Sequence, residues 1–491
     1  MASSSDTLPP EFLQRAQQGG IVVTEIPKLD LESYIQNYRG RTRLDRLLTI
    51  ARTSTVLSVD ALKLAIHEVV SRGRDVQLYR DAYELLRVLG PNEPEAKYNS
   101  VWVSETEKAN RSETHHLEAE LKKYKNNLVK ESIRTADLEQ MGNEDLGKHF
   151  EKIGELALAY EAYSKCRADV SSAKHIIEVG LHLARLSFYR RDWSAVTTNV
   201  NKMSGLQTEG TNGTDKTQQT ICNIMYGLSY LGQAKYPEAA RSFLQVDPTV
   251  SPEHFDPFAS PNDIAVYGGL LALATMSRAE LSGVLDNSSF RTFLELEPHI
   301  RRAISQFVNG RYSACLSILE SYHSDYLLDI NLQPHLKHLY SVIRGKCIFH
   351  FVQPFSCVTI DNLNAAFSPQ GGSIDQELVD MIGNGALDAR IDAIDRVVTI
   401  TSPNPRAKMQ AASLAAAKNY EKEALDRIRR IGIVSADLEV KGKHKNQGAA
   451  ALGALQGAGM RWGDGPSEGG LDDYPGSQPQ GPSSIAMSDL I

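Results

Sequence analysis

The order of patterns within residues 334–402 constrains the fold more than any other feature of this sequence. Three helical patterns come first, and Thr359 and Ser373 are placed to cap the second and the third. Two short runs follow, in which apolar residues recur with the spacing of strands. Three helices followed by a two-stranded ribbon predict a winged helix.

Charge decides which kind of partner this winged helix would contact. Residues 334–402 contain five positive and seven negative side chains. The third helix contains Asp375, Glu377 and Asp380 but no lysine or arginine. Because nucleic-acid binding depends on neutralising phosphates, such a helix would repel a groove. We therefore favour a protein partner, with a nucleic-acid-binding protein as an alternative.

The predicted ribbon is a candidate binding site for that protein partner. A short exposed ribbon has unpaired backbone groups at its edge, which a neighbouring chain can extend by strand addition. The residues that we assign to this edge are Arg390, Ile391, Asp392, Val397, Val398 and Ile400.

Composition limits the class of protein. The chain has 491 residues, a net charge of −7 and a sequence pI near 6.0, which argues against a dedicated nucleic-acid or membrane-surface binder. Its five cysteines form no CxxC pair, so we expect reduced thiols in the nucleus and cytoplasm. The first residues lack a signal-peptide pattern, and the longest apolar run, residues 264–276, is too short to span a bilayer.

An internal repeat precedes the winged helix. A glycine is followed by an aromatic residue three positions later, then an alanine and a second aromatic, both from Gly147 to Tyr163 and from Gly227 to Phe243. These are the small and large residues of a helix–turn–helix repeat. The predicted second helices begin at Leu156, Trp193, Tyr236 and Tyr312, with a period near 40. Two helices per unit at this period predict a mainly α protein with a TPR-like α-solenoid.

These patterns divide the chain into six parts. We predict a flexible lead (1–28), an N-terminal helical region (29–140), TPR-like repeats (141–333), a winged-helix subdomain (334–402), a C-terminal helix (403–432) and a disordered tail rich in Gly, Pro and Ser (433–491).

The C-terminal helix has a narrow apolar stripe at three- and four-residue spacing. Its members are Leu414, Ala417, Tyr420, Ala424, Ile428 and Ile431. A stripe of this kind beyond the last domain suits a helical bundle with other chains. The alternative, a helix folded back on its own domain, is equally compatible with the pattern.

No motif in the sequence predicts a reaction. There is no Walker A pattern, no GxSxG elbow and no His-x-His followed by Asp, which a zinc isopeptidase would need. His335 and His338 lie three apart without a third ligand at metal-site spacing. We therefore expect no catalytic, cofactor-binding or metal-binding residues; an enzyme whose site is assembled only in space remains the alternative.

Several longer stretches carry a family resemblance. A helical array that runs into a winged helix, with GALDARID at residues 385–392, resembles the PCI-domain family. Residues 29–48, 121–134, 154–179 and 327–355 are similar to the COP9 signalosome subunit 1 family, and a related proteasome lid subunit is the second candidate.

The resemblance implies a non-catalytic scaffold in an assembly that removes a ubiquitin-like modifier from cullins. Hydrolysis would belong to a separate zinc-dependent isopeptidase subunit. The partners implied are other PCI subunits, that isopeptidase and cullin-RING ligases, with no nucleic acid and no membrane. The resemblance also implies that winged helices of this family lie side by side and that their C-terminal helices share a bundle. The predicted ribbon edge would then contact a neighbouring winged helix, and the apolar stripe would join the bundle.

Overall fold

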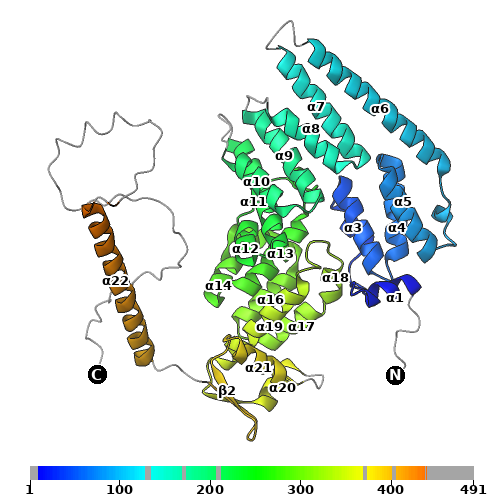
Figure 1. Ribbon diagram of the computed structural model, residues 1–491. Helices are drawn as coiled ribbons and strands as arrows, with labels where there is room; N and C mark the ends of the chain where they lie inside the picture. The colour runs from blue at the N-terminus through cyan, green and yellow to red at the C-terminus, as the bar shows by residue number, and fades with distance from the viewer. Residues whose placement is uncertain are drawn as a thin grey trace. The chain divides into compact units, whose positions relative to one another are not determined.

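The computed structural model describes residues 9–127, 134–168, 173–205, 212–368, 373–400, 405–436 and 438. The chain divides into two compact units, residues 1–402 and 403–491. The first is almost entirely helical and ends in a small sheet (Figure 1), which confirms the predicted fold class. Most of the predicted tail lies outside the described residues.

The N-terminal helices form a core of their own. Their bounds are α1 Pro10–Gln17, α2 Leu31–Gln36, α3 Gly40–Thr53, α4 Ser58–Arg72 and α5 Val76–Leu89, followed by the long α6, Ser100–Asn127. We predicted a flexible lead over residues 1–28, and α1 corrects this within the described part. Phe12 is 3% exposed and Val23 pairs with Ser54 in a parallel bridge, so apolar burial orders this segment.

Helical pairs follow as a stacked array. Figure 1 shows successive pairs lying against each other from α7 onward. The first six helices are α7 Arg134–Ile153, α8 Leu156–Ala168, α9 Ala173–Tyr189, α10 Trp193–Ser204, α11 Asn212–Gly232 and α12 Tyr236–Leu244. The next six are α13 Pro261–Thr275, α14 Arg278–Asp286, α15 Ser288–Leu296, α16 Pro298–Val308, α17 Tyr312–Glu320 and α18 His323–Leu327.

The repeat pattern predicted the start of each second helix. Leu156, Trp193, Tyr236 and Tyr312 are the first residues of α8, α10, α12 and α17. A backbone residue with positive φ stands two positions before each of them: Gly154 (+95°), Arg191 (59°), Ala234 (59°) and Gly310 (76°). This left-handed residue ends the first helix of each pair and turns the chain into the second.

Glycines set the spacing within the pairs. A Cβ atom on Gly147 would lie 2.8 Å from the ring of Tyr163, and one on Gly227 would lie 2.7 Å from the ring of Phe243. Both rings belong to fully buried side chains. The recurring glycine is therefore the place where the aromatic residue of the partner helix packs against bare backbone.

The winged helix completes the first unit. It consists of α19 Leu336–Val352, β1 Cys357–Thr359, α20 Ile360–Phe367, α21 Asp375–Gly383, β2 Ala389–Asp392 and β3 Val397–Ile400. Thr359 accepts a hydrogen bond from the Asn362 N–H and caps α20 as predicted. One hydrophobic core extends from Ala184 in the repeats to Val398 in β3, so array and winged helix are packed together.

The second unit contains one described helix, α22, which spans Pro405–Ser435. Its 31 residues correspond to a length of about 46 Å at 1.5 Å per residue.

Candidate functional sites

The sheet of the winged helix has three antiparallel strands in the order β1, β3, β2, which corrects the predicted two-stranded ribbon. β3 is central, because it pairs with β1 on one side and with β2 on the other. Val397, Val398 and Ile400 therefore provide no edge for strand addition. Among the described residues the edges are β1 and β2, so residues 390–392 keep the edge position predicted for them.

The two faces of the sheet divide these residues further. Ile391 and Val398 lie opposite each other in the register of β2 and β3, and Val398 is fully buried. Ile400 packs against the same core. Arg390 and Asp392 are exposed, as the alternation of side chains along a strand requires. Core-facing side chains support the sheet, whereas the exposed pair faces outward.

The turn between β2 and β3 adds an apolar residue that the sequence analysis did not select. The Asp392 carboxylate accepts hydrogen bonds from the N–H groups of Ile394 (2.9 Å) and Asp395 (3.3 Å), which fixes the turn. Ile394 is 93% exposed. A single apolar residue between two strands gives no periodicity, so no sequence signal distinguished it.

Two cations of the winged helix have internal partners. Arg344 Nε donates to both carboxylate oxygens of Glu377, at 3.0 and 2.9 Å. Lys346 Nζ donates to the carbonyl oxygens of Leu273 (2.6 Å) and Met276, where the C-terminal end of the α13 dipole favours a positive charge. Burial lowers the pKa of Lys346 to about 8. Arg344 and Lys346 are therefore already paired within the protein, whereas a nucleic-acid-binding winged helix would use such cations to contact phosphates.

The predicted stripe of α22 is exposed along its length. Leu414, Tyr420, Ile428 and Ile431 are between 62% and 75% exposed, Ala417 is exposed, and Ala424 is half-buried. Most helical stability in proteins comes from the packing of an apolar face, and large exposed apolar patches mark interaction sites. No described residue of the second unit covers this stripe. Its role in binding stays a prediction.

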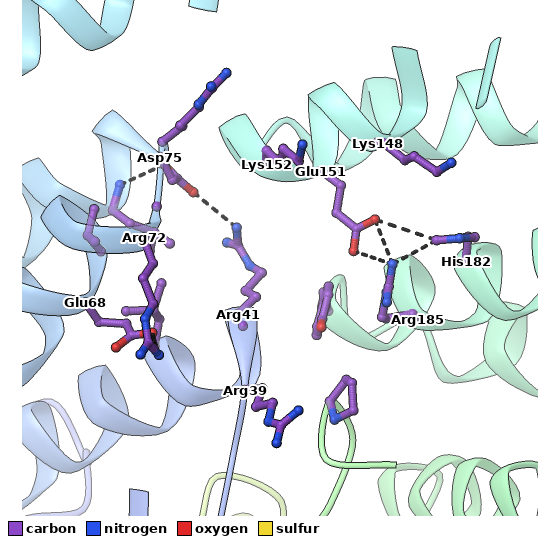
Figure 2. A pocket seen from close by; sticks show the side chains of 18 residues that line it. Arg39, Arg41, Glu68, Arg72, Asp75, Lys148, Glu151, Lys152, His182 and Arg185 are labelled. Atoms are coloured by element: carbon purple, nitrogen blue, oxygen red, sulfur yellow. Dashed lines mark hydrogen bonds and ion pairs between the residues drawn. The ribbon is translucent and has the colours of Figure 1, made fainter. Parts of the chain in front are cut away.

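A cavity of about 690 Å³ was not predicted from the sequence. Figure 2 shows one wall formed by side chains of the N-terminal helices and the other by side chains of α7 and α9. The walls meet at Gly154, where an added Cβ would lie 2.0 Å from Asp75 Oδ2. The Thr42 hydroxyl donates to the carbonyl oxygen of Pro257, which also lines the cavity, and joins α3 to the loop before α13.

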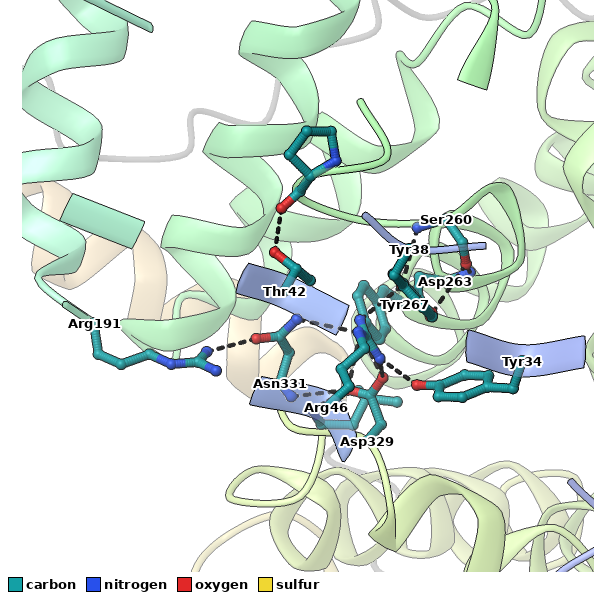
Figure 3. A network of polar contacts seen from close by, with 12 residues as sticks. Tyr34, Tyr38, Thr42, Arg46, Arg191, Ser260, Asp263, Tyr267, Asp329 and Asn331 are labelled. Atoms are coloured by element: carbon teal, nitrogen blue, oxygen red, sulfur yellow. Dashed lines mark hydrogen bonds and ion pairs between the residues drawn. The ribbon is translucent and has the colours of Figure 1, made fainter. Parts of the chain in front are cut away.

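A buried polar network fixes the N-terminal helices to the array (Figure 3). Arg46 of α3 is 0% exposed, and its guanidinium lies 2.7 Å from Asp263 Oδ2 of α13 and 2.7 Å from Asp329 Oδ2. Tyr38 donates to Asp263 at 2.7 Å, and Tyr267 donates to Asp329 at 2.7 Å. One cation and two carboxylates are thus held by fully buried tyrosines. The spacing of these residues in the sequence did not predict the network.

The two carboxylates of this network differ in pKa. Burial raises the pKa of Asp263 to about 6, against the lowering effect of Arg46. Burial also acts on Asp329, but the charge of Arg46 and hydrogen bonds from Tyr267 and the Leu332 N–H lower its pKa below the ordinary value. The better hydrogen-bonded carboxylate is therefore the more acidic one.

The described residues contain no group of three His, Cys, Asp or Glu side chains arranged to hold a metal ion. Within the same part of the chain, no helix is long and apolar enough to cross a membrane.

Comparisons with known proteins match most of the chain. A family model for the 26S proteasome subunit RPN7 matches residues 99–283, and the PCI domain model matches residues 319–402, which include the whole winged helix. COP9 signalosome complex subunit 1 of Neurospora crassa is 47% identical over 438 residues, which cover 89% of this chain and 94% of that protein. The chain belongs to the COP9 signalosome subunit 1 family.

Other relatives support this placement. COP9 signalosome complex subunit 1 of Emericella nidulans is 44% identical over 85% of this chain and 84% of its own length. The 26S proteasome non-ATPase regulatory subunit 6 of Oryza sativa subsp. japonica is 21% identical over 62% of this chain. The family resemblance noted in the sequence is confirmed, and the signalosome subunit 1 family is favoured over the related proteasome subunits.

Proposed function

We propose that this chain is a non-catalytic scaffold subunit of the COP9 signalosome that supports removal of a ubiquitin-like modifier from cullin-RING ubiquitin ligases. The observation that carries the scaffold role is the exposed apolar stripe of α22 beyond a winged helix with an open β2 edge. Burying one leucine or isoleucine side chain contributes about 1.5–3 kcal/mol, so burial of Leu414, Ile428 and Ile431 against neighbouring helices would favour association.

The proposed partners are other PCI subunits, the zinc-dependent isopeptidase subunit of the same complex and cullin-RING ligases. The β2 edge, with Arg390 and Asp392 facing outward, would take the winged helix of a neighbour. The stripe of α22 would join a helical bundle. Chemistry is assigned to the isopeptidase subunit, in keeping with the absence of a hydrolase motif in this sequence.

The proposed location is the nucleus and cytoplasm. None of the five cysteines forms a disulfide, and four of them are buried. Reduced thiols are the normal state in those compartments.

Affinity purification of the tagged full-length chain from cells, followed by mass spectrometry, tests the assembly. We expect signalosome subunits to co-purify in near-equal amounts. Recovery of proteasome lid subunits in their place would contradict the proposal, and recovery of nucleic acid without protein partners would favour the alternative PCI function.

A second assay tests the non-catalytic role. The purified chain alone is incubated with a cullin that carries the ubiquitin-like modifier, and the assembled complex serves as positive control. We expect cleavage only by the complex. Cleavage by the chain alone, retained after repeated purification, would overturn the assignment.

A further inference from the structure

The cavity between the N-terminal helices and the first repeats has a charge opposite to that of the chain. Seven cationic and three acidic side chains line it, a formal excess of four positive charges in a protein whose net charge is −7. Arg39, Arg41, Arg72 and Arg74 belong to the N-terminal wall. Lys148, Lys152 and Arg185 belong to the wall formed by α7 and α9. Both walls therefore present positive charge to the same space.

The acidic residues of the lining already have cationic partners there. Arg41 lies 3.2 Å from Asp75, and Arg185 lies 2.8 Å from Glu151, as Figure 2 shows. The third acid, Glu68, is paired with Arg72 at 3.2 Å. Each of the three carboxylates of the lining therefore has a cationic partner within the cavity, and the lining as a whole keeps its formal excess of four positive charges.

Four cations of the lining, two on each wall, are accessible to a ligand. Lys152 has no ion pair among the described residues. Lys148 forms an ion pair with Glu144 at 2.6 Å, and its side chain is 46% exposed. Arg39 and Arg72 have side chains that are 65% and 73% exposed. Their partners include Asp256 and Glu68, whose side chains are only 12% and 14% exposed. A guanidinium group has five N–H donors, so an anion can share Arg39 and Arg72 with these carboxylates.

The cavity is preformed and of ligand size. Its two walls are joined where Gly154 meets Asp75 and where Thr42 bonds to Pro257, so binding needs no large closure. A volume of about 690 Å³ lies within the range of pockets that take small molecules, about 300–1,000 Å³. Guanidinium groups bind phosphate in a bidentate manner, and an anion between two positive walls relieves their mutual repulsion.

We propose that this cavity binds a small ligand that carries several phosphate groups, held by Arg39 and Arg72 on one wall and by Lys148 and Lys152 on the other. The ligand would tie the N-terminal helices to the repeat array. This site is independent of the surfaces through which the chain is proposed to assemble.

Inorganic tripolyphosphate is a suitable probe, titrated calorimetrically into the full-length chain at about 50 and 200 mM salt. We expect one saturable site whose affinity falls at the higher salt, because binding depends on charge. Inorganic phosphate should bind at least tenfold more weakly, because it carries less charge and fewer acceptor oxygens for the four cations. Binding of citrate as tightly as tripolyphosphate would contradict selection for phosphate, and tighter binding of an acidic peptide would identify the cavity as a protein-docking site instead.

Variants on each wall separate this site from general surface attraction. Lys148→Gln combined with Lys152→Gln, and separately Arg72→Gln, should each weaken tripolyphosphate binding at least tenfold. The matched control is Lys202→Gln combined with Lys235→Gln, which removes two exposed positive charges outside the cavity and should bind like the wild type. Melting temperatures without ligand establish that each variant is folded. Equal affinity of the cavity variants and the control, or no saturable binding by the wild type, would overturn the proposal.

Discussion

Arg46 and Asp263 are 217 residues apart in the sequence, yet their side chains form a fully buried ion pair with 2.7 Å between Nη2 and Oδ2. Asp329 binds the same guanidinium from a third segment, 283 residues from Arg46. The three residues join α3, the first turn of α13 and the segment before α19. Arg46 is therefore a central contact among those that hold the N-terminal helices on the array.

Removal of Arg46 should destabilise the protein strongly. Arg46→Ala leaves two buried carboxylates without their cation, and loss of one partner of a buried ion pair costs about 3–5 kcal/mol. Arg46→Lys should lie between the alanine variant and the wild type, because an ammonium group cannot reproduce the planar fork that contacts both aspartates. Thermal unfolding of the full chain measures the loss of stability in each variant, and Arg87→Ala, at an exposed position, serves as the control. A melting temperature unchanged in Arg46→Ala would contradict it.

The same network predicts a pH dependence. Burial raises the pKa of Asp263 from 3.8 to about 6, so between these values the folded state binds a proton that the unfolded state releases. This contribution to stability grows as the pH falls below about 6 and is lost as the pH rises through that value. The wild type should therefore gain on the order of 1 kcal/mol over Asp263→Asn between pH 7.5 and pH 5.

Melting temperatures of both proteins across this range provide the test. Titrating groups outside the network, such as His149, whose pKa is lowered by burial, change both proteins alike and cancel in the difference. Asp329 shares Arg46 with Asp263, but its pKa lies below the ordinary value, so it stays ionised in this pH range. Exposed Asp286→Asn serves as the matched control. A gap between wild type and Asp263→Asn that stays constant with pH would show that Asp263 does not titrate in this window.

The packing of the repeats predicts a specific clash and its relief. Gly227→Ala would place a Cβ atom 2.7 Å from the ring of Phe243, and overpacking of this kind costs about 1–3 kcal/mol. Phe243→Leu in the same chain removes the ring, so the double variant should lose less stability than the sum of the single ones. Gly283→Ala is the control, because nothing lies within 4 Å of its added Cβ. Additive losses in the double variant would argue against the clash.

The sequence predicted those parts of the fold that depend on local periodicity. The starts of α10 at Trp193 and α12 at Tyr236 were predicted from the entry positions that recur with a period near 40. Thr359 was predicted to cap α20 because it precedes an apolar helical run. The stripe of α22 also follows from spacing alone. In each case the residues that carry the signal lie within a few helical turns of one another.

The features missed depend on contacts between distant segments. β1 is only three residues long, and Val358 pairs with Val398, forty positions later. Because the sequence analysis missed this third strand, it predicted β3 as an edge strand. Val398 was therefore predicted at the surface, although it lies in the core. The Arg46 network and the cationic cavity likewise assemble from segments whose approach no short pattern encodes.

This chain is proposed to hold other subunits through its C-terminal elements, and co-purification with the α22 stripe altered measures that role most directly. Leu414, Tyr420, Ile428 and Ile431 are replaced together by glutamine, which keeps helix propensity but removes apolar surface. The matched control places glutamine at Ala415, Asn419, Lys422 and Asp426 on the opposite face.

Quantitative mass spectrometry of the tagged chains then gives the amount of each partner subunit per copy of bait. We predict that the stripe variant loses at least nine-tenths of the signalosome subunits, while the opposite-face control retains them at the wild-type level. Full retention of partners by the stripe variant, with the control behaving in the same way, would contradict the account.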